Sequence, residues 1–373
     1  MYIFKINIGL AFALSAWLVT GCVLSSRKID VSYQYFPQRP LYVQSLAESQ
    51  IIIVDAQRFQ VIGTLNHPLL RAASAIEVDS QGHLFIAIDA DATHDYREIW
   101  KVDPETGEFL NRIMLPGWAP TLLAMASNDL LLVGHSLEKR NGSSDLDVIY
   151  APDARYLQTL EIPGLAMDIA FDTEQVYVAI SSSQKPSDNG VLAYNLHSKQ
   201  GLTKSIHYRL LQPVNQPSLS PVSLASAQDN LLYLILFQYD ANKPCEQHGQ
   251  LMLLNITTRT WTPLMMLDDI GPIAVLSDGT LIVGEACPWG KGRLLHIDPN
   301  QRRIIHQMTL KPGVWTLCPL GFDIYAVGIN PILSAEDDSA PLLFVVDARA
   351  WHTVAEIAIP LGSARDIACS RKE

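Results

Sequence analysis

The sequence predicts an all-β fold: a seven-bladed β-propeller of four-stranded blades, with the ring closed by pairing of the C-terminal strand into blade one. Three observations predict this fold. One motif recurs seven times, tight turns separate short apolar runs between its copies, and the last apolar segment can complete the first repeat. Helical periodicity is essentially absent after residue 22, so strands are the regular elements that the pattern supports.

The recurring motif is an apolar strand that ends in Asp or Asn, followed by a short polar turn and a second strand. The runs IWKVDPETGEFLNRIMLP from Ile99 and LLHIDPNQRRIIHQMTL from Leu294 show it most clearly. The residue that ends the first strand marks seven copies at intervals of 43 to 60 residues: Asp55, Asp103, Tyr150, Asn195, Asn255, Asp298 and Asp347. Short strands repeated at such an interval are typical of propeller blades.

A second pair of strands lies between successive copies of the motif. The runs SAIEVDSQGHLFIAI from Ser74 and IAVLSDGTLIVG from Ile273 are apolar segments joined by a glycine-containing turn, which is a hairpin signal. One stretch does not fit this pattern. Residues 201–221, with prolines at 213, 217 and 221, have no strong period, and we expect an extended loop there between blades four and five.

The first repeat lacks an inner strand. Leu41–Gln44, Ile51–Asp55 and Gln60–Leu65 read as its outer strands, and Ala364–Cys369 reads as the missing inner one. Pairing this last strand into blade one would close the ring and remove the unpaired edges that make open sheets aggregate.

These repeats resemble the YVTN and NHL-type β-propeller families in two patterns. One is "VD" followed by a glycine turn and an apolar run; the other is an apolar strand ending in Asp with, later, two apolar residues one position apart and then Pro. The resemblance covers about residues 40–370. It implies the fold and no particular activity, because these families include enzymes, scaffolds and ligand binders.

The N-terminus carries an export signal. Lys5 precedes an uncharged apolar run over residues 6–19, and the sequence LVTGC at 18–22 resembles the lipobox of bacterial lipoproteins. That resemblance implies removal of residues 1–21, acylation of Cys22 and a cell-envelope location, anchored to a membrane and facing the periplasm or the exterior. An ordinary signal peptide or an uncleaved anchor are the alternatives. Val23 provides no aspartate retention signal, which favours an outer membrane where the host has one.

The predicted organisation is therefore a signal peptide over 1–21, a tether over 22–39 and the propeller over 40–373. The formal net charge of −11 argues against nucleic acid as a partner.

The four remaining cysteines predict two disulfides in an oxidising compartment. Cys245 and Cys287 occupy equivalent places in neighbouring repeats, and Cys318 and Cys369 both fall near the end of an inner strand, in blades that meet when the ring closes. We therefore predict the pairs Cys245–Cys287 and Cys318–Cys369; free buried thiols are the alternative.

The loops suggest which face of the ring binds. Loops between the second and third strands are long and polar in nearly every blade, whereas the opposite face has tight turns. Long loops collect binding residues, and we expect the face that carries them, the long-loop face, to bind a ligand or partner; loop drift without a ligand is the alternative. The candidate residues on this face are Asp89, Asp91, His94, Asp95, Trp118, His135, Tyr239, His248, Trp289 and Trp315.

Catalytic and metal-binding signals are weak. The cluster Asp89, Asp91, His94 and Asp95 could bind Ca²⁺, although a solvated polar loop is the simpler interpretation, and no other cofactor is expected. The sequence therefore favours a membrane-tethered scaffold that binds an envelope protein or an extracellular ligand.

The alternative function is a metal-dependent hydrolase or lactonase with a site at the central channel. Asp168, Asp366 and Glu77 would be its carboxylates, since all three lie near inner strands.

Overall fold

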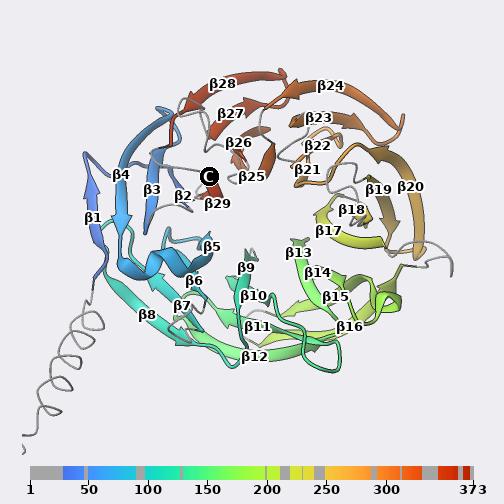
Figure 1. Cartoon of the computed structure of the whole chain (residues 1–373), viewed down its shortest axis with the longest axis horizontal. Coiled ribbons are helices and arrows are strands. Elements are labelled where there is room, and N and C mark those ends of the chain that lie inside the picture. Colours follow the sequence, from blue (N-terminus) through green and yellow to red (C-terminus); the bar gives the residue numbers. More distant parts are fainter. Residues whose placement is uncertain are drawn as a thin grey trace, which may run out of the picture.

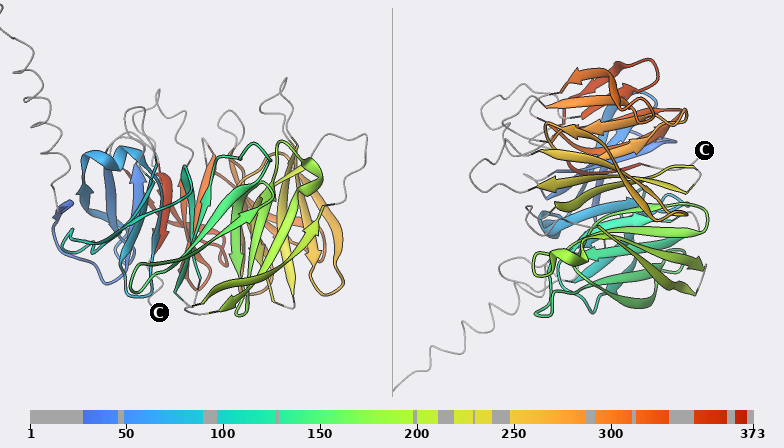
Figure 2. Two further views of the ribbon diagram at one scale, coloured as in Figure 1. Left: turned by 90° about the horizontal axis from the view of Figure 1, so that it is seen from below. Right: turned by 90° about the vertical axis from the view of Figure 1, so that its right-hand side faces the viewer.

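The structure is a computed structural model. It describes residues 28–45, 49–89, 97–126, 129–197, 200–210, 219–228, 230–238, 248–286, 292–310, 313–329, 343–359 and 364–369. Seven antiparallel sheets stand around a central axis, which confirms the seven-bladed propeller (Figure 1). Seen from the side, the ring is flat and the strands of each blade cross between its two faces (Figure 2).

The blades follow one another along the chain, with the innermost strand first in all but blade one. Blade one contains β1 (Asp30–Tyr33), β2 (Pro40–Ser45), β3 (Gln50–Asp55), β4 (Gln60–Asn66) and, from the end of the chain, β29 (Ala364–Cys369). Blade two contains β5 (Ala73–Val78), β6 (Leu84–Ile88), β7 (Glu98–Val102) and β8 (Phe109–Met114). Blade three contains β9 (Pro120–Met125), β10 (Leu130–His135), β11 (Ser144–Tyr150) and β12 (Arg155–Ile162).

The remaining blades repeat this order. Blade four contains β13 (Leu165–Phe171), β14 (Gln175–Ser181), β15 (Gly190–His197) and β16 (Gly201–Arg209). Blade five contains β17 (Leu219–Ser226), β18 (Leu231–Gln238), β19 (Gly249–Asn255) and β20 (Thr260–Leu267). Blade six contains β21 (Ile273–Val275), β22 (Leu281–Gly284), β23 (Arg293–Asp298) and β24 (Arg303–Thr309). Blade seven contains β25 (Val314–Gly321), β26 (Ile324–Ile329), β27 (Leu343–Asp347) and β28 (His352–Ile357).

Two short 3₁₀ helices are also present: η1 (Pro68–Ala72) joins blades one and two, and η2 (Pro186–Asp188) lies between β14 and β15. Among the residues described, no helix is both long enough and apolar enough to span a bilayer.

The ring closes as the sequence predicted. β29 pairs antiparallel with β2, with Leu41 opposite Cys369 and Val43 opposite Ile367. The disulfide Cys318–Cys369 then joins β29 to β25, the innermost strand of blade seven, which confirms that predicted pair. The other predicted pair, Cys245–Cys287, lies outside the described residues.

The structure differs from the expectation for residues 201–221. Gly201–Arg209 is not a loop but β16, the outermost strand of blade four, and it pairs with β15 along its whole length. Its apolar side chains cover both faces: Leu202 packs toward blade three, whereas Ile206 and Tyr208, beyond a bulge, pack toward blade five.

Part of the range 22–39, predicted as a tether, belongs to the sheet of blade one. Asp30–Tyr33 forms β1, which pairs with β4 and gives blade one a fifth strand at the outer rim. The backbone N–H of Ile29 donates to Gly107 O of blade two at 2.8 Å, and Tyr33 Oη donates to Glu105 O. A Cβ on Gly107 would lie 2.2 Å from Ile29 O, so the segment crosses from blade one to blade two in a place that only glycine leaves open.

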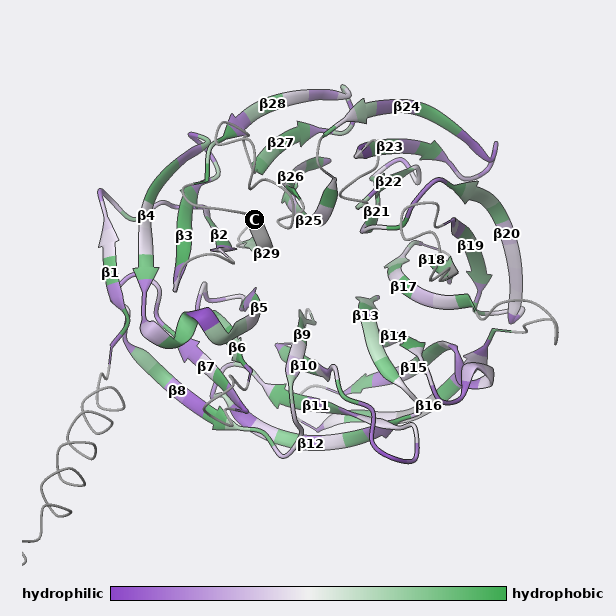
Figure 3. Cartoon of the chain, in the orientation of Figure 1, coloured by the Kyte–Doolittle hydropathy of each residue, from purple (hydrophilic) through white to green (hydrophobic). Residues whose placement is uncertain are grey.

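The core lies between the blades. The described buried apolar residues form seven clusters, and each cluster joins one pair of neighbouring blades. Successive residues of β3 contribute to opposite sides: Ile51 and Ile53 pack on blade two, whereas Ile52 and Val54 pack on blade seven. Such a strand is buried on both faces and reads as an uninterrupted apolar run. Outer strands such as β8 and β24 instead contain both hydrophobic and hydrophilic residues (Figure 3).

Candidate functional sites

The innermost strands share an irregularity near the long-loop face. The pairing register skips one residue in each of β5, β13, β17 and β25, which identifies Ser74, Met167, Val222 and Trp315 as β-bulge residues. A bulge re-aims a side chain and often stands beside a functional site. Here the bulges lie at equivalent positions around the channel.

The innermost strands enclose a central cavity of about 1160 Å³. Two large apolar side chains on its wall are accessible, because Met167 is 37% exposed and Trp315 is 43% exposed. Both side chains come from bulges. The predicted binding residue Trp315 therefore lies in the wall of the channel, where a ligand can reach its ring.

Two of the channel carboxylates connect neighbouring blades. Asp168 accepts a hydrogen bond from the backbone N–H of Leu224 in blade five at 2.7 Å, and Asp366 accepts one from Ile76 in blade two at 2.9 Å. The second oxygen of each carboxylate accepts from the N–H of the next residue in its own strand. Each aspartate directly follows a bulge in its innermost strand, at position 167 in β13 and at position 365 in β29, so the two perform the same bracing role in different blades.

The third channel carboxylate is Glu77, and Asp168 has a shifted pKa. Glu77 Oε1 accepts from the N–H of Val78 at 2.9 Å. Burial raises the pKa of Asp168 to about 6, against the opposing effect of its two backbone hydrogen bonds. Within the described part of the chain, no group of three His, Cys, Asp or Glu side chains is arranged to hold a metal ion.

The other predicted residues on the long-loop face have different environments. Trp118 is 50% exposed, and the Arg97 guanidinium lies 3.6 Å from the centre of its ring. His248 is exposed immediately before β19, and Asp89 is half-buried after β6, where its N–H donates to Ala72 O. These three residues do not line the central cavity, so the structure does not bring them together with Trp315.

His135 does not lie on the surface, contrary to the expectation. It is 2% exposed, with Nε2 2.9 Å from Asp147 Oδ2 and Nδ1 2.8 Å from Trp118 O. Asp147 is fully buried and also accepts from Thr159 Oγ1. His135 is thus a hydrogen-bonded core residue of blade three, and it is not accessible to a partner. The predicted residues Asp91, His94, Asp95, Tyr239 and Trp289, together with Cys22, lie outside the described residues.

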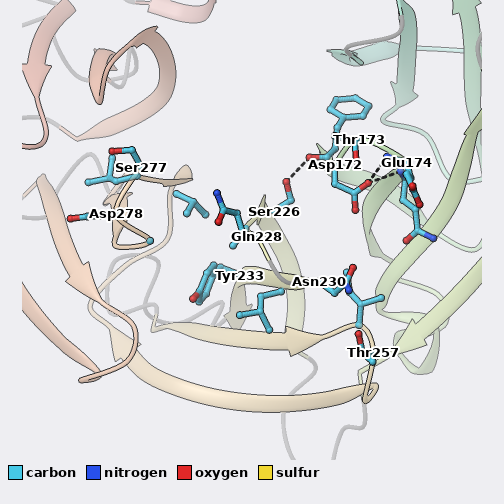
Figure 4. A pocket seen from close by; sticks show the side chains of 18 of the residues that line it. Asp172, Thr173, Glu174, Ser226, Gln228, Asn230, Tyr233, Thr257, Ser277 and Asp278 are labelled. Carbon is cyan, nitrogen blue, oxygen red and sulfur yellow. Dashed lines mark hydrogen bonds between the residues drawn. The ribbon is translucent and has the colours of Figure 1, made fainter.

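A second concave site, which the sequence did not indicate, lies on the tight-turn face (Figure 4). Its walls are the β13–β14, β17–β18 and β21–β22 turns of blades four, five and six, and the groove encloses about 1020 Å³. We call it the turn groove. Its polar lining residues include Asp172, Glu174, Gln228, Tyr233 and Asp278. Short turns gave no signal of a site, because the groove forms only where three turns from separate repeats meet.

Comparison with known proteins shows the fold. No protein-family model and no curated protein matches the chain. A structure from Bacteroides fragilis, described as a candidate 6-phosphogluconolactonase, has a TM-score of 0.61 at 10% identity, covering 89% of this chain and 97% of that one. The periplasmic gluconolactonase of Pseudomonas aeruginosa has a TM-score of 0.58 at 14% identity, covering 89% and 98%. Apo AztD from Citrobacter koseri has a TM-score of 0.50 at 13% identity, covering 89% and 97%.

Proposed function

We propose that this chain is a lipid-anchored, extracytoplasmic β-propeller that binds an envelope protein or an extracellular ligand at the channel mouth on its long-loop face. In this proposal, Cys22 carries the lipid and the mature protein faces the periplasm or the exterior. The observation that carries the binding function is the pair of exposed apolar side chains, Met167 and Trp315, in the wall of the central cavity.

Aromatic and methionine side chains are enriched where proteins bind their partners, and methionine adapts to irregular surfaces. At about 1160 Å³, the cavity slightly exceeds the roughly 300–1,000 Å³ of small-ligand sites, so it has room for a ligand or for side chains of a partner. Asp168 and Asp366 each use both oxygens to accept backbone hydrogen bonds, which gives these carboxylates a structural role that the binding proposal does not depend on.

Site-specific photo-crosslinking tests the binding surface. A photoreactive amino acid at position 315 should capture a partner in intact cells. The same amino acid at Met266, which is 58% exposed on β20 at the outer rim, is the matched control. Trp315→Ala should then weaken the purified complex at least tenfold, as expected for a central aromatic contact. Capture of the same partner from both positions would contradict the proposal.

Metabolic labelling tests the anchor separately. The full chain should incorporate labelled palmitate and sediment with membranes, whereas Cys22→Ala should do neither. Labelling that survives in Cys22→Ala would show that the lipid is attached to another residue.

A hydrolase, such as a lactonase, is the second candidate function. Asp168 favours it, because a carboxyl group in the channel wall with a pKa near 6 could donate or accept a proton near neutral pH. Lactone hydrolysis by the purified protein, with and without added Ca²⁺, would support this candidate if Asp168→Asn abolished it. Activity that survives this substitution would exclude Asp168 as the catalytic residue.

A further inference from the structure

The turn groove has an unusual floor. Tyr233 of β18 lies at its base and is only 5% exposed, yet its hydroxyl forms no hydrogen bond with any residue that the structure describes. Figure 4 shows its side chain between the turns of blades five and six. The hydroxyl oxygen itself is not buried, so it is accessible from the groove. It therefore bonds to water, or to a ligand group that takes the place of that water.

Blade four provides an internal comparison. Tyr177 is the third residue of β14, as Tyr233 is of β18, and each pairs with an alanine of the innermost strand. The Tyr177 hydroxyl donates to Asp172 Oδ2 at 2.6 Å and also lies 2.9 Å from Gln175 Oε1. At the same strand position, the protein thus satisfies one hydroxyl internally and leaves the other directed at the groove.

The charge of the groove selects the class of ligand. Its described lining contains Asp172, Glu174 and Asp278 but no lysine or arginine. Hydrogen bonds from Thr280 lower the pKa of Asp278, so this carboxylate is ionised at neutral pH. An anionic ligand would meet only like charges here, whereas a neutral or cationic ligand would not.

The lining also offers spare hydrogen-bonding groups. The side chains of Glu174 and Gln228 form no hydrogen bonds with described residues. Together with Thr173, Asn230 and Thr257, they present carboxylate, amide and hydroxyl groups to the same space. Such a mixture of donors and acceptors matches a molecule that carries several hydroxyl groups.

We propose that the turn groove binds a hydroxyl-rich small molecule of sugar size, neutral or cationic, with its hydroxyl hydrogen-bonded to Tyr233. This site lies on the opposite face from the channel mouth and is independent of the function proposed above. The two sites would allow the propeller to hold a small ligand and a partner at the same time.

Three probes of one ring skeleton and different charge test the proposal: D-glucose, D-glucosamine and D-glucuronate, titrated into the full chain and followed by NMR. We expect saturable binding of glucosamine and glucose, tighter for glucosamine, and none of glucuronate. Tyr233→Phe should weaken binding by about fivefold to tenfold, the effect of one lost hydrogen bond. Tyr42→Phe is the control: it removes an unpartnered tyrosine hydroxyl of blade one, outside the groove, and should leave the affinity unchanged.

A second variant separates charge from folding. Glu174→Gln should reduce the preference for glucosamine over glucose while both sugars still bind. The proposal is overturned if no probe binds saturably, if glucuronate binds as tightly as glucosamine, or if Tyr233→Phe binds like the wild type.

Discussion

In five copies of the repeat motif, the structure shows the Asp or Asn that ends the strand capping the turn that follows it. Asp55 Oδ1 accepts from the N–H groups of Gln57 and Arg58, and Asp298 Oδ1 accepts from Asn300 and Gln301 in the same way. Short polar side chains that bond to the backbone two or three residues later favour turns. The most visible sequence signal of the repeat is therefore a local hydrogen bond.

The fourth residue after this capping residue adopts the left-handed backbone conformation in most blades. Five non-glycine residues do so, with φ between 52° and 57°: Phe59, Ala154, Arg259, Arg302 and Trp351. Only blade two has a glycine at the corresponding place, Gly107, with φ of 72°. A residue with a Cβ is disfavoured in this conformation by roughly 1–2 kcal/mol.

This strain predicts a stabilising substitution. Arg302→Gly should raise the free energy of unfolding by roughly 0.5–1 kcal/mol, because relief of the strain outweighs the extra entropy of glycine in the unfolded chain. Arg303→Gly is the control: Arg303 is exposed in β24, and the same change there should lower stability by a similar amount. Urea denaturation measures both, and equal losses in the two variants would contradict the prediction.

Asp168 predicts a specific pH dependence of stability. Its pKa is about 6 in the folded protein against 3.8 for an ordinary aspartate. Between these values the folded state holds a proton that the unfolded state has lost, so stability is fully present below about pH 4 and falls as pH rises through about 6. The loss should approach about 3 kcal/mol.

Asp168→Asn removes this titration, since an amide does not ionise. The difference in the free energy of unfolding between wild type and variant should therefore change between pH 4 and pH 6 and be level on either side. A difference that stays constant across this range would contradict the raised pKa.

At the scale of elements, the two strands at the chain ends complete blade one. β29 is its innermost strand and β1 its outermost, so the blade contains strands from both ends of the chain. The disulfide Cys318–Cys369 secures the inner junction with blade seven, and the segment before β1 contacts blade two at the rim. Both junctions oppose opening of the ring next to blade one.

The disulfide should contribute strongly to stability because it closes a loop between residues 51 positions apart. Replacing both cysteines with alanine should lower the free energy of unfolding by about 4 kcal/mol, mainly through greater freedom of the unfolded chain. Guanidinium denaturation measures the loss. Reductant should destabilise the wild type but should not affect this junction in the double variant. If the wild type and the double variant unfold at the same guanidinium concentration without reductant, the disulfide adds no stability.

At the scale of the whole molecule, the attachment of β1 limits how the propeller can sit on a membrane. Lys28 already bridges to Glu108 of blade two. If Cys22 is acylated as proposed, only residues 23–27 separate the lipid from this contact, and six residue steps span at most about 20 Å. The rim of blades one and two would then stay close to the bilayer, with the two faces of the ring directed sideways.

Photo-crosslinking to lipid tests this orientation in the acylated protein bound to phosphatidylethanolamine–phosphatidylglycerol vesicles. A photoreactive amino acid at Leu110, which is 46% exposed on β8, should form lipid adducts. The same group at Met266 on β20, across the ring in Figure 1, should form few. Equal adducts from both positions in vesicle-bound protein would contradict an edge-on orientation, whereas failure to bind vesicles would instead contradict the anchor.

Much of the fold could be predicted from the sequence, because its signals are local. Capping residues, tight turns and apolar runs identify strands without knowledge of their neighbours, and their repetition counts the blades. β1 has no such signal: the run DVSY is mostly exposed, and only its pairing with β4 makes it a strand. β16 also lacks a clear signal, because a bulge interrupts the alternation of its residues and a proline-containing segment follows it.

Less of the candidate sites could be predicted. The sequence places Trp315 on the long-loop face, but its exposure depends on a bulge that re-aims its side chain. His135 is an ordinary loop-end histidine in the sequence, and only the fold buries it against Asp147. The turn groove has no sequence signature, since its walls come from three repeats.

The sequence by itself determined the number of blades, the closing strand and the closing disulfide. Each follows from local residue patterns that recur at the interval of the repeat. The tertiary structure decided what the polar side chains do. Whether a carboxylate braces two blades, as Asp168 and Asp366 do, or a hydroxyl is left facing a groove, as at Tyr233, depends on which neighbouring blade stands opposite it. Which groups of neighbouring blades stand opposite each other is a property of the closed ring, and no single repeat contains this information.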